Sequence, residues 1–92
     1  MTVKELVPNV FEPETRRDFE TWISDYPRGY VINRKSSNDV TIHFGGCGHF
    51  KGIVGQDLIR NRKVLSRNRG ILEAYWADSG EATLQPCPDC HT

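Results

Sequence analysis

Residues 29–50 read GYVINRKSSNDVTIHFGGCGHF and contain the pattern that decides the fold. Two runs rich in β-branched and aromatic residues, 29–35 and 40–44, flank the polar turn sequence SSND, which predicts a β-hairpin. In the second run apolar side chains alternate with Thr41 and His43. Because neighbouring side chains of a strand point to opposite faces, we expect His43 to face solvent rather than the core.

A helix is predicted on each side of this hairpin. Before it, Phe19, Trp22, Ile23 and Tyr26 follow the i, i+3, i+4, i+7 spacing of one helical face, which predicts a helix over residues 14–25. After it, RNRGILEAYWADSG, residues 67–80, shows a second such face, and Gly80 is placed to cap the helix end. Trp22 and Trp76 lie on these faces, so both are expected in the core.

Shorter segments complete a small sheet. Prolines interrupt residues 1–13, which predicts an extended N-terminal arm. FKGIVG, 50–55, is a candidate strand; the next segment is either a loop or a strand around 63–66, and EATLQ, 81–85, reads as a last strand. The chain has 92 residues, too few for two cores. Residues 1–92 are therefore predicted to form one α+β domain, a small antiparallel β-sheet with two packed helices.

The three cysteines point to a metal site. Cys87 and Cys90 have the two-residue spacing at which a turn directs both sulfurs to one point, and Cys47 follows a strand in a glycine-rich turn. Tetrahedral zinc accepts three thiolates and one histidine. The sequence thus predicts a structural Cys3His zinc site that joins segments about forty residues apart and contributes to the free energy of folding.

Each of the three histidines is a candidate for the fourth ligand. His43, four residues before Cys47, ranks first, because Gly45 and Gly46 between them let the chain curl back. His49 ranks second, since one residue between it and Cys47 gives a tighter chelate. His91 ranks last, because side chains of adjacent residues diverge.

The same residues suggest enzymes, which we judge less consistent with the sequence. PCPDC resembles half of the zinc deaminase signature, but no His or Cys is followed two residues later by the required Glu. Cys47 with His49 as base lacks an evident orienting group. A metal-dependent nuclease would need His49 with Asp39 or Asp57 to activate water. We therefore expect a protein that is not an enzyme.

The charges are unevenly distributed, although lysine plus arginine and aspartate plus glutamate both total 12. Residues 26–69 hold nine basic and two acidic side chains, and both ends are acidic. A basic segment of this kind suits the phosphate backbone of DNA or RNA, unless its charges simply pair within the fold. The predicted nucleic-acid contacts are Arg34, Lys35, Lys51, Arg60, Arg62, Lys63, Arg67 and Arg69.

The sequence predicts no contact with membranes. It contains no apolar run of about 18 residues, and the N-terminus lacks the basic-then-apolar layout of a secretory signal. An odd number of cysteines fits a metal site in a reducing compartment better than a disulfide framework. A cytoplasmic location is expected.

The order of motifs over residues 29–90 resembles a known module. A Gly-aromatic-Val strand (GYV), a His-x3-Cys turn, a helix with LEAYWA and a closing Cys-x-x-Cys are similar to a small bacterial module of actinobacterial and phage-related proteins. Such modules occur near or fused to HNH-type or other restriction endonucleases. The resemblance implies His43, Cys47, Cys87 and Cys90 as zinc ligands. Binding of nucleic acid is the expected function, and a protein–protein adaptor or small regulator in a phage or defence system is the alternative.

Overall fold

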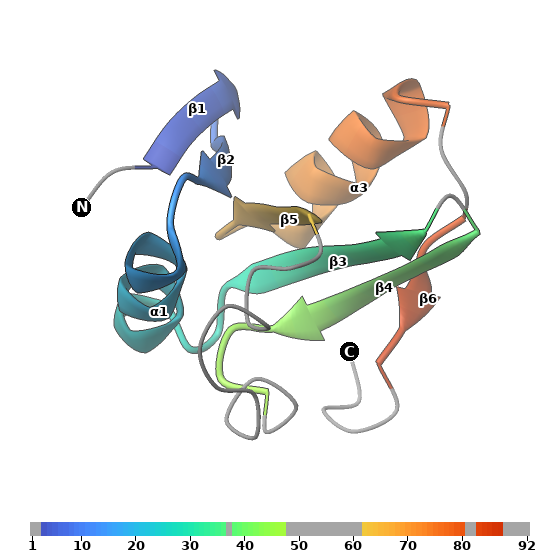
Figure 1. Cartoon of the computed structure of the whole chain (residues 1–92). Coiled ribbons are helices and arrows are strands. Elements are labelled where there is room, and N and C mark those ends of the chain that lie inside the picture. The colour runs from blue at the N-terminus through green and yellow to red at the C-terminus, as the bar shows by residue number, and fades with distance from the viewer. Residues whose placement is uncertain (1–2, 37, 48–61, 81–82, 88–92) are drawn as a thin grey trace.

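A mixed sheet with a helix on each face forms the fold (Figure 1). The computed structural model describes residues 3–36, 38–47, 62–80 and 83–87. Within them six strands follow the order β1-β2-β5-β3-β4-β6. The predicted α+β class with two packed helices is confirmed.

The helices and strands agree with most of the predicted ranges. The predicted hairpin, both helices and the strand around 63–66 are confirmed, whereas the candidate strand 50–55 lies outside the described residues. Of the strand expected at 81–85, the structure describes residues 83–85 and only Gln85 belongs to a strand. The elements are β1 (Val3–Val7), β2 (Val10–Pro13), α1 (Arg16–Asp25), β3 (Tyr30–Ser36), β4 (Asp39–Phe44), β5 (Arg62–Ser66), α3 (Arg69–Asp78) and β6 (Gln85–Pro86).

Strand pairing differs from the expectation in two places. β6 runs parallel to β4, so the sheet is mixed rather than purely antiparallel. The segment expected as an extended arm is a hairpin of β1 and β2, and Phe11 of β2 pairs with Leu65 of β5. Val10 is fully buried. The described part of residues 1–13 is therefore an integral part of the sheet.

Both helices begin at a side-chain cap. The Thr15 hydroxyl accepts a hydrogen bond from the Asp18 N–H at 3.1 Å, and the Asn68 side-chain oxygen accepts one from the Ile71 N–H at 3.0 Å. Each cap satisfies a backbone donor that a helix start leaves without a partner. Gly80, with φ +72°, ends α3 in the left-handed region as predicted.

Each face of the sheet has its own apolar core. Successive residues of the central strands alternate between the faces: Val31 packs on the α1 side and Ile32 on the α3 side. The α1 core contains Phe19, Trp22, Val31, Cys47, Leu65 and Cys87. The α3 core contains Val10, Ile32, Val40, Ile42, Val64, Leu72 and Trp76. The predicted burial of both tryptophans is confirmed.

Candidate metal centre

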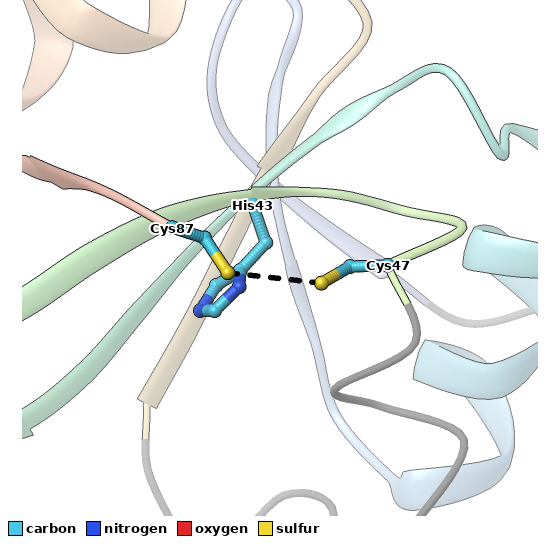
Figure 2. A group of neighbouring side chains, drawn as sticks. All are labelled: His43, Cys47 and Cys87. Carbon is cyan, nitrogen blue, oxygen red and sulfur yellow. Dashed lines mark hydrogen bonds between the residues drawn. The ribbon is translucent and has the colours of Figure 1, made fainter. Parts of the chain in front are cut away.

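Three predicted ligands lie close together on the face of the sheet that α1 covers. His43 belongs to β4, Cys47 follows that strand in a turn, and Cys87 directly follows β6 (Figure 2). Their donor atoms all lie within 4.8 Å of one another, and all three residues are buried. The structure thus brings together the three predicted ligands that lie within its described ranges.

His43 is not on a solvent-facing side as expected. It is 3% exposed and pairs in register with Val31, a residue of the α1 core. The side chains of β4 alternate between the two faces of the sheet as predicted, but the face that carries His43 is covered by the α1 core. A strand buried on both faces can therefore place a polar side chain in the interior.

The turn after β4 brings Cys47 back toward His43. The Cys47 N–H donates to the Phe44 carbonyl at 3.0 Å, while the N–H groups of Gly45 and Gly46 donate at 2.8 Å to carbonyls of the segment after α1. A Cβ on Gly45 would lie 2.5 Å from a backbone oxygen of that segment. The glycines thus permit the close approach that fixes the turn, as the spacing of the sequence predicted.

β6 positions the third ligand. It pairs with β4 through Thr41↔Gln85 and Ile42↔Pro86, and the Cys87 N–H then donates to the Ile42 carbonyl at 3.0 Å. Because this bond lies one residue before His43, it holds Cys87 beside the imidazole. A two-residue strand is sufficient to bring the distant thiol to the site.

The sulfur geometry fits a tetrahedral ion. The Sγ atoms of Cys47 and Cys87 are 3.8 Å apart (Figure 2). Two thiolates bound to zinc at about 2.3 Å and a tetrahedral angle would be separated by about 3.8 Å. This distance also permits an S–H···S hydrogen bond and is far beyond a disulfide bond of about 2.05 Å. Imidazole with thiolates is a donor set that suits zinc rather than magnesium or calcium.

Cys90 lies outside the described residues, as do the competing donors His49 and His91. Cys47 and Cys87 are each 2% exposed and belong to the α1 core. Donors buried among apolar side chains suit an ion with a structural role better than one that must meet a substrate.

Two of the predicted nucleic-acid contacts are paired with carboxylates. Arg62 Nε lies 2.7 Å from a Glu12 oxygen, and Arg69 Nε lies 2.6 Å from a Glu73 oxygen. The hydrogen bond to Glu12 is also the main cause that raises the pKa of Arg62 above its usual value. These two side chains are thus partly neutralised within the fold.

Lys63 is buried and does not belong to the exposed basic set. It is 4% exposed; its Nζ donates to the Asn33 side-chain oxygen at 2.8 Å and lies 5.8 Å from the centre of the Phe19 ring. Burial, and then the charge of Lys35, lowers the pKa of Lys63 to about 8. The sequence around Lys63 does not indicate its burial, because whether both faces of a sheet are covered depends on the tertiary structure.

The other basic residues are divided between the faces of the sheet. Arg34 is partly exposed and pairs in register with Arg62, two residues along β3 from Ile32 of the α3 core. Lys35, the next residue, is exposed, as is Arg67 after β5, whereas Lys51 and Arg60 lie outside the described residues. Within the described ranges, the predicted contacts thus include paired, buried and exposed side chains.

Comparisons of the chain with family models, curated proteins and solved structures found no match. Among the residues placed in the structure, no helix has both the length and the apolar character needed to cross a bilayer. The geometry of His43, Cys47 and Cys87 is therefore the basis for the metal centre proposed below.

Proposed function

We propose that the chain is a non-enzymatic, zinc-stabilised binding module. The observation that supports this proposal is the buried group of His43, Cys47 and Cys87, whose donor atoms lie within 4.8 Å of one another. Cys90, at the zinc-binding spacing from Cys87, is proposed as the fourth ligand. Four protein ligands would leave no position for water or substrate, which favours a structural role.

The bound ion would supply a cross-link between two distant parts of the chain. His43 and Cys47 would hold it from the end of β4, and Cys87 from the segment that follows β6. Thiolate ligands require a compartment that keeps cysteines reduced, and we propose the cytoplasm. The ion would thus fix the C-terminal segment against the edge of the sheet.

Metal analysis of the purified, reduced protein tests this proposal. We expect one zinc per chain, lost in Cys87→Ser and His43→Ala. His49→Ala is the matched control and should retain the metal, while Cys90→Ser should lose it if Cys90 is the fourth ligand. A wild-type protein that binds no zinc, or a Cys87→Ser variant that binds it normally, would contradict the metal centre.

We further propose that the partner is nucleic acid. Lys35 and Arg67 support this, because each is exposed and neither has a carboxylate within 4.0 Å among the residues that the structure describes. Phosphate contacts make binding fall steeply with salt. Affinity for DNA and RNA oligonucleotides should therefore decrease as salt rises, and binding that ignores salt would contradict the proposal.

The alternative is a protein–protein adaptor, or a small regulator in a phage or defence system. One feature favours it: Val7, 40% exposed, lies on the edge strand β1 and is the large apolar side chain most exposed among those described. Recovery of one stoichiometric protein partner from nuclease-treated lysate, lost in Val7→Lys, would support this function. Recovery that is unchanged in Val7→Lys would remove the role of β1.

A further inference from the structure

A cavity of about 530 Å³ lies where the β1–β2 hairpin, α1 and the start of α3 meet. This volume falls within the range of about 300–1,000 Å³ typical of small-ligand pockets. Its lining combines apolar, aromatic and polar side chains, among them Val3, Phe11, Trp22, Tyr26, Arg67 and Asn68. It is separate from the group of His43, Cys47 and Cys87, none of which lines it.

One wall of the cavity is aromatic. The ring centres of Trp22 and Tyr26 are 5.2 Å apart, with an angle of 55° between the ring planes. The Arg67 guanidinium carbon lies 4.7 Å from the centre of the Tyr26 ring. An arginine held against a ring is restricted in its motion and keeps N–H groups that suit a phosphate. Trp22 is only 2% exposed, so the aromatic surface open to a ligand here is that of half-buried Tyr26, beside the positive charge of Arg67.

The charge of the lining favours an anion. Among the described residues that line the cavity, only Arg67 carries a formal charge. Asn68 caps α3, whose first turn contains no acidic residue, so the positive end of the helix dipole is not offset there. Because the Asn68 side-chain oxygen is used by the Ile71 N–H, its NH2 group remains as a donor. The Arg67 charge, the start of α3 and the Asn68 NH2 group could therefore all contact the anionic part of a ligand.

A second hollow extends this site. Its volume is about 340 Å³, and its lining shares Tyr26 and Arg67 with the first cavity and adds one acidic and one basic side chain, Asp25 and Arg28. The two hollows therefore adjoin at the Tyr26–Arg67 pair. A ligand longer than the first cavity could continue into the second.

We propose that this cavity binds a nucleotide, either free or as one unit of a single strand. The base lies against Tyr26, behind which Trp22 is packed, and the phosphate lies near Arg67 and the start of α3. Stacking on aromatic rings with arginine close by is how single strands are commonly held. This inference rests on the nucleic-acid part of the proposed function and is independent of the metal centre.

Titration of the 15N-labelled, zinc-loaded protein tests the location. The chain has two tryptophans, and therefore two indole N–H signals, which Trp76→Phe assigns. Trp22 lines the cavity, whereas Trp76 lines a different hollow on the α3 side. On addition of a mixed-sequence single-stranded oligonucleotide, the Trp22 signal should shift in a saturable manner while the Trp76 signal stays. A shift of Trp76 alone, or of neither, would overturn the proposal.

Two matched arginine variants test the phosphate contact. Arg67→Gln should weaken oligonucleotide binding about tenfold or more and reduce the salt slope by about one. Arg17→Gln makes the same change of charge at an exposed position of α1 that lines neither cavity, and should weaken binding less than about twofold. Tyr26→Leu should cost about fivefold or more through lost stacking. Equal losses in both arginine variants would contradict a localised site.

The choice of probe separates the sources and the proposals. Saturable binding of adenosine 5′-monophosphate supports a free nucleotide, and binding of the oligonucleotide alone supports a unit of a strand. Inorganic phosphate that binds as tightly as the nucleotide would overturn the role of the base. Oligonucleotide binding that survives Arg67→Gln but falls in Lys35→Gln would overturn this site and leave the nucleic-acid function standing. No binding at low salt would overturn both.

Discussion

Lys63 is a basic residue whose side chain is buried in the fold. Its ammonium is buried on the α1 side and donates to Asn33. Burial, together with the charge of Lys35, lowers the pKa of Lys63 from 10.5 to about 8. Below about pH 8 the folded protein therefore carries the full cost of a buried charge, and between about pH 8 and 10.5 it binds fewer protons than the unfolded chain.

Lys63 should therefore make the protein more stable as the pH rises through this interval. A shift of this size corresponds to a contribution on the order of 3 kcal/mol to the free energy of unfolding. Urea unfolding of the wild type and Lys63→Met near pH 8 and pH 10 measures it as the difference between the two proteins. If both pH profiles have the same slope, Lys63 keeps its ordinary pKa in the fold.

Gly45 and Gly70 form a matched pair of substitutions. A Cβ on Gly45 would lie 2.5 Å from the Tyr26 carbonyl oxygen, so Gly45→Ala should displace the turn that holds Cys47 and cost about 1–3 kcal/mol of stability. At Gly70, in α3, the nearest atom would be 3.4 Å away. Gly70→Ala should therefore be neutral or stabilise by up to about 1 kcal/mol.

Thermal unfolding and competition with a zinc chelator distinguish the two substitutions. Only Gly45→Ala should lower both the melting temperature and the zinc affinity, because only this turn carries a ligand. Equal effects of the two alanines would mean that the tight approach of the turn has no energetic importance.

At the scale of elements, α1 depends on its N-terminal cap. The Thr15 hydroxyl accepts a hydrogen bond from the Asp18 N–H, one of the N–H groups in the first turn of the helix. Thr15→Ala should lower the free energy of unfolding by about 1 kcal/mol, whereas Thr15→Asp keeps an acceptor and should be nearly neutral. Denaturant midpoints of the two variants measure this, and a loss in both would assign the effect to another contact of Thr15.

Local patterns predicted those elements whose signals are local. The helix near 14–25 and the β3–β4 hairpin follow from side-chain spacing and turn residues, so they were predicted closely. The place of residues 3–13 was missed, because β2 joins the sheet through Phe11 and Leu65, more than fifty residues apart. The sequence of residues 1–13 alone does not indicate that Phe11 pairs with Leu65.

The grouping of His43, Cys47 and Cys87 was predictable for a different reason. The chemistry of thiols and the two glycines before Cys47 restrict the possible partners, and the structure confirms the group of His43, Cys47 and Cys87. The burial of His43 and Lys63 was not predictable, since a polar residue in an alternating strand looks the same whether its face meets water or α1. Burial on both faces depends on the arrangement of the whole chain.

At the scale of the whole molecule, removal of zinc should destabilise the protein. The proposed ion joins segments forty residues apart in the sequence, and only the folded chain presents the complete ligand set. At free zinc about a thousandfold above the dissociation constant, the ion would add about 4 kcal/mol to the free energy of unfolding. The melting temperature should fall with a chelator and recover when zinc is added back.

Cys87→Ser provides the control for metal removal. It lacks one ligand, so its melting temperature should be low and should change little with chelator or zinc. A wild type that is equally insensitive would show that the three donors are packed as ordinary core residues, as buried cysteines often are.

The strand order has a consequence for synthesis on the ribosome. β5 lies between β2 and β3, so the β1–β2 and β3–β4 hairpins, which are made first, share no backbone hydrogen bonds and are joined into one sheet only by β5. A nascent chain that ends before Arg62 therefore exposes two separate ribbons with unpaired edges. The sheet can form only when β5 has been made, and Cys87 reaches Cys47 only after that. The nascent chain is therefore most prone to aggregation in the interval before β5 is made.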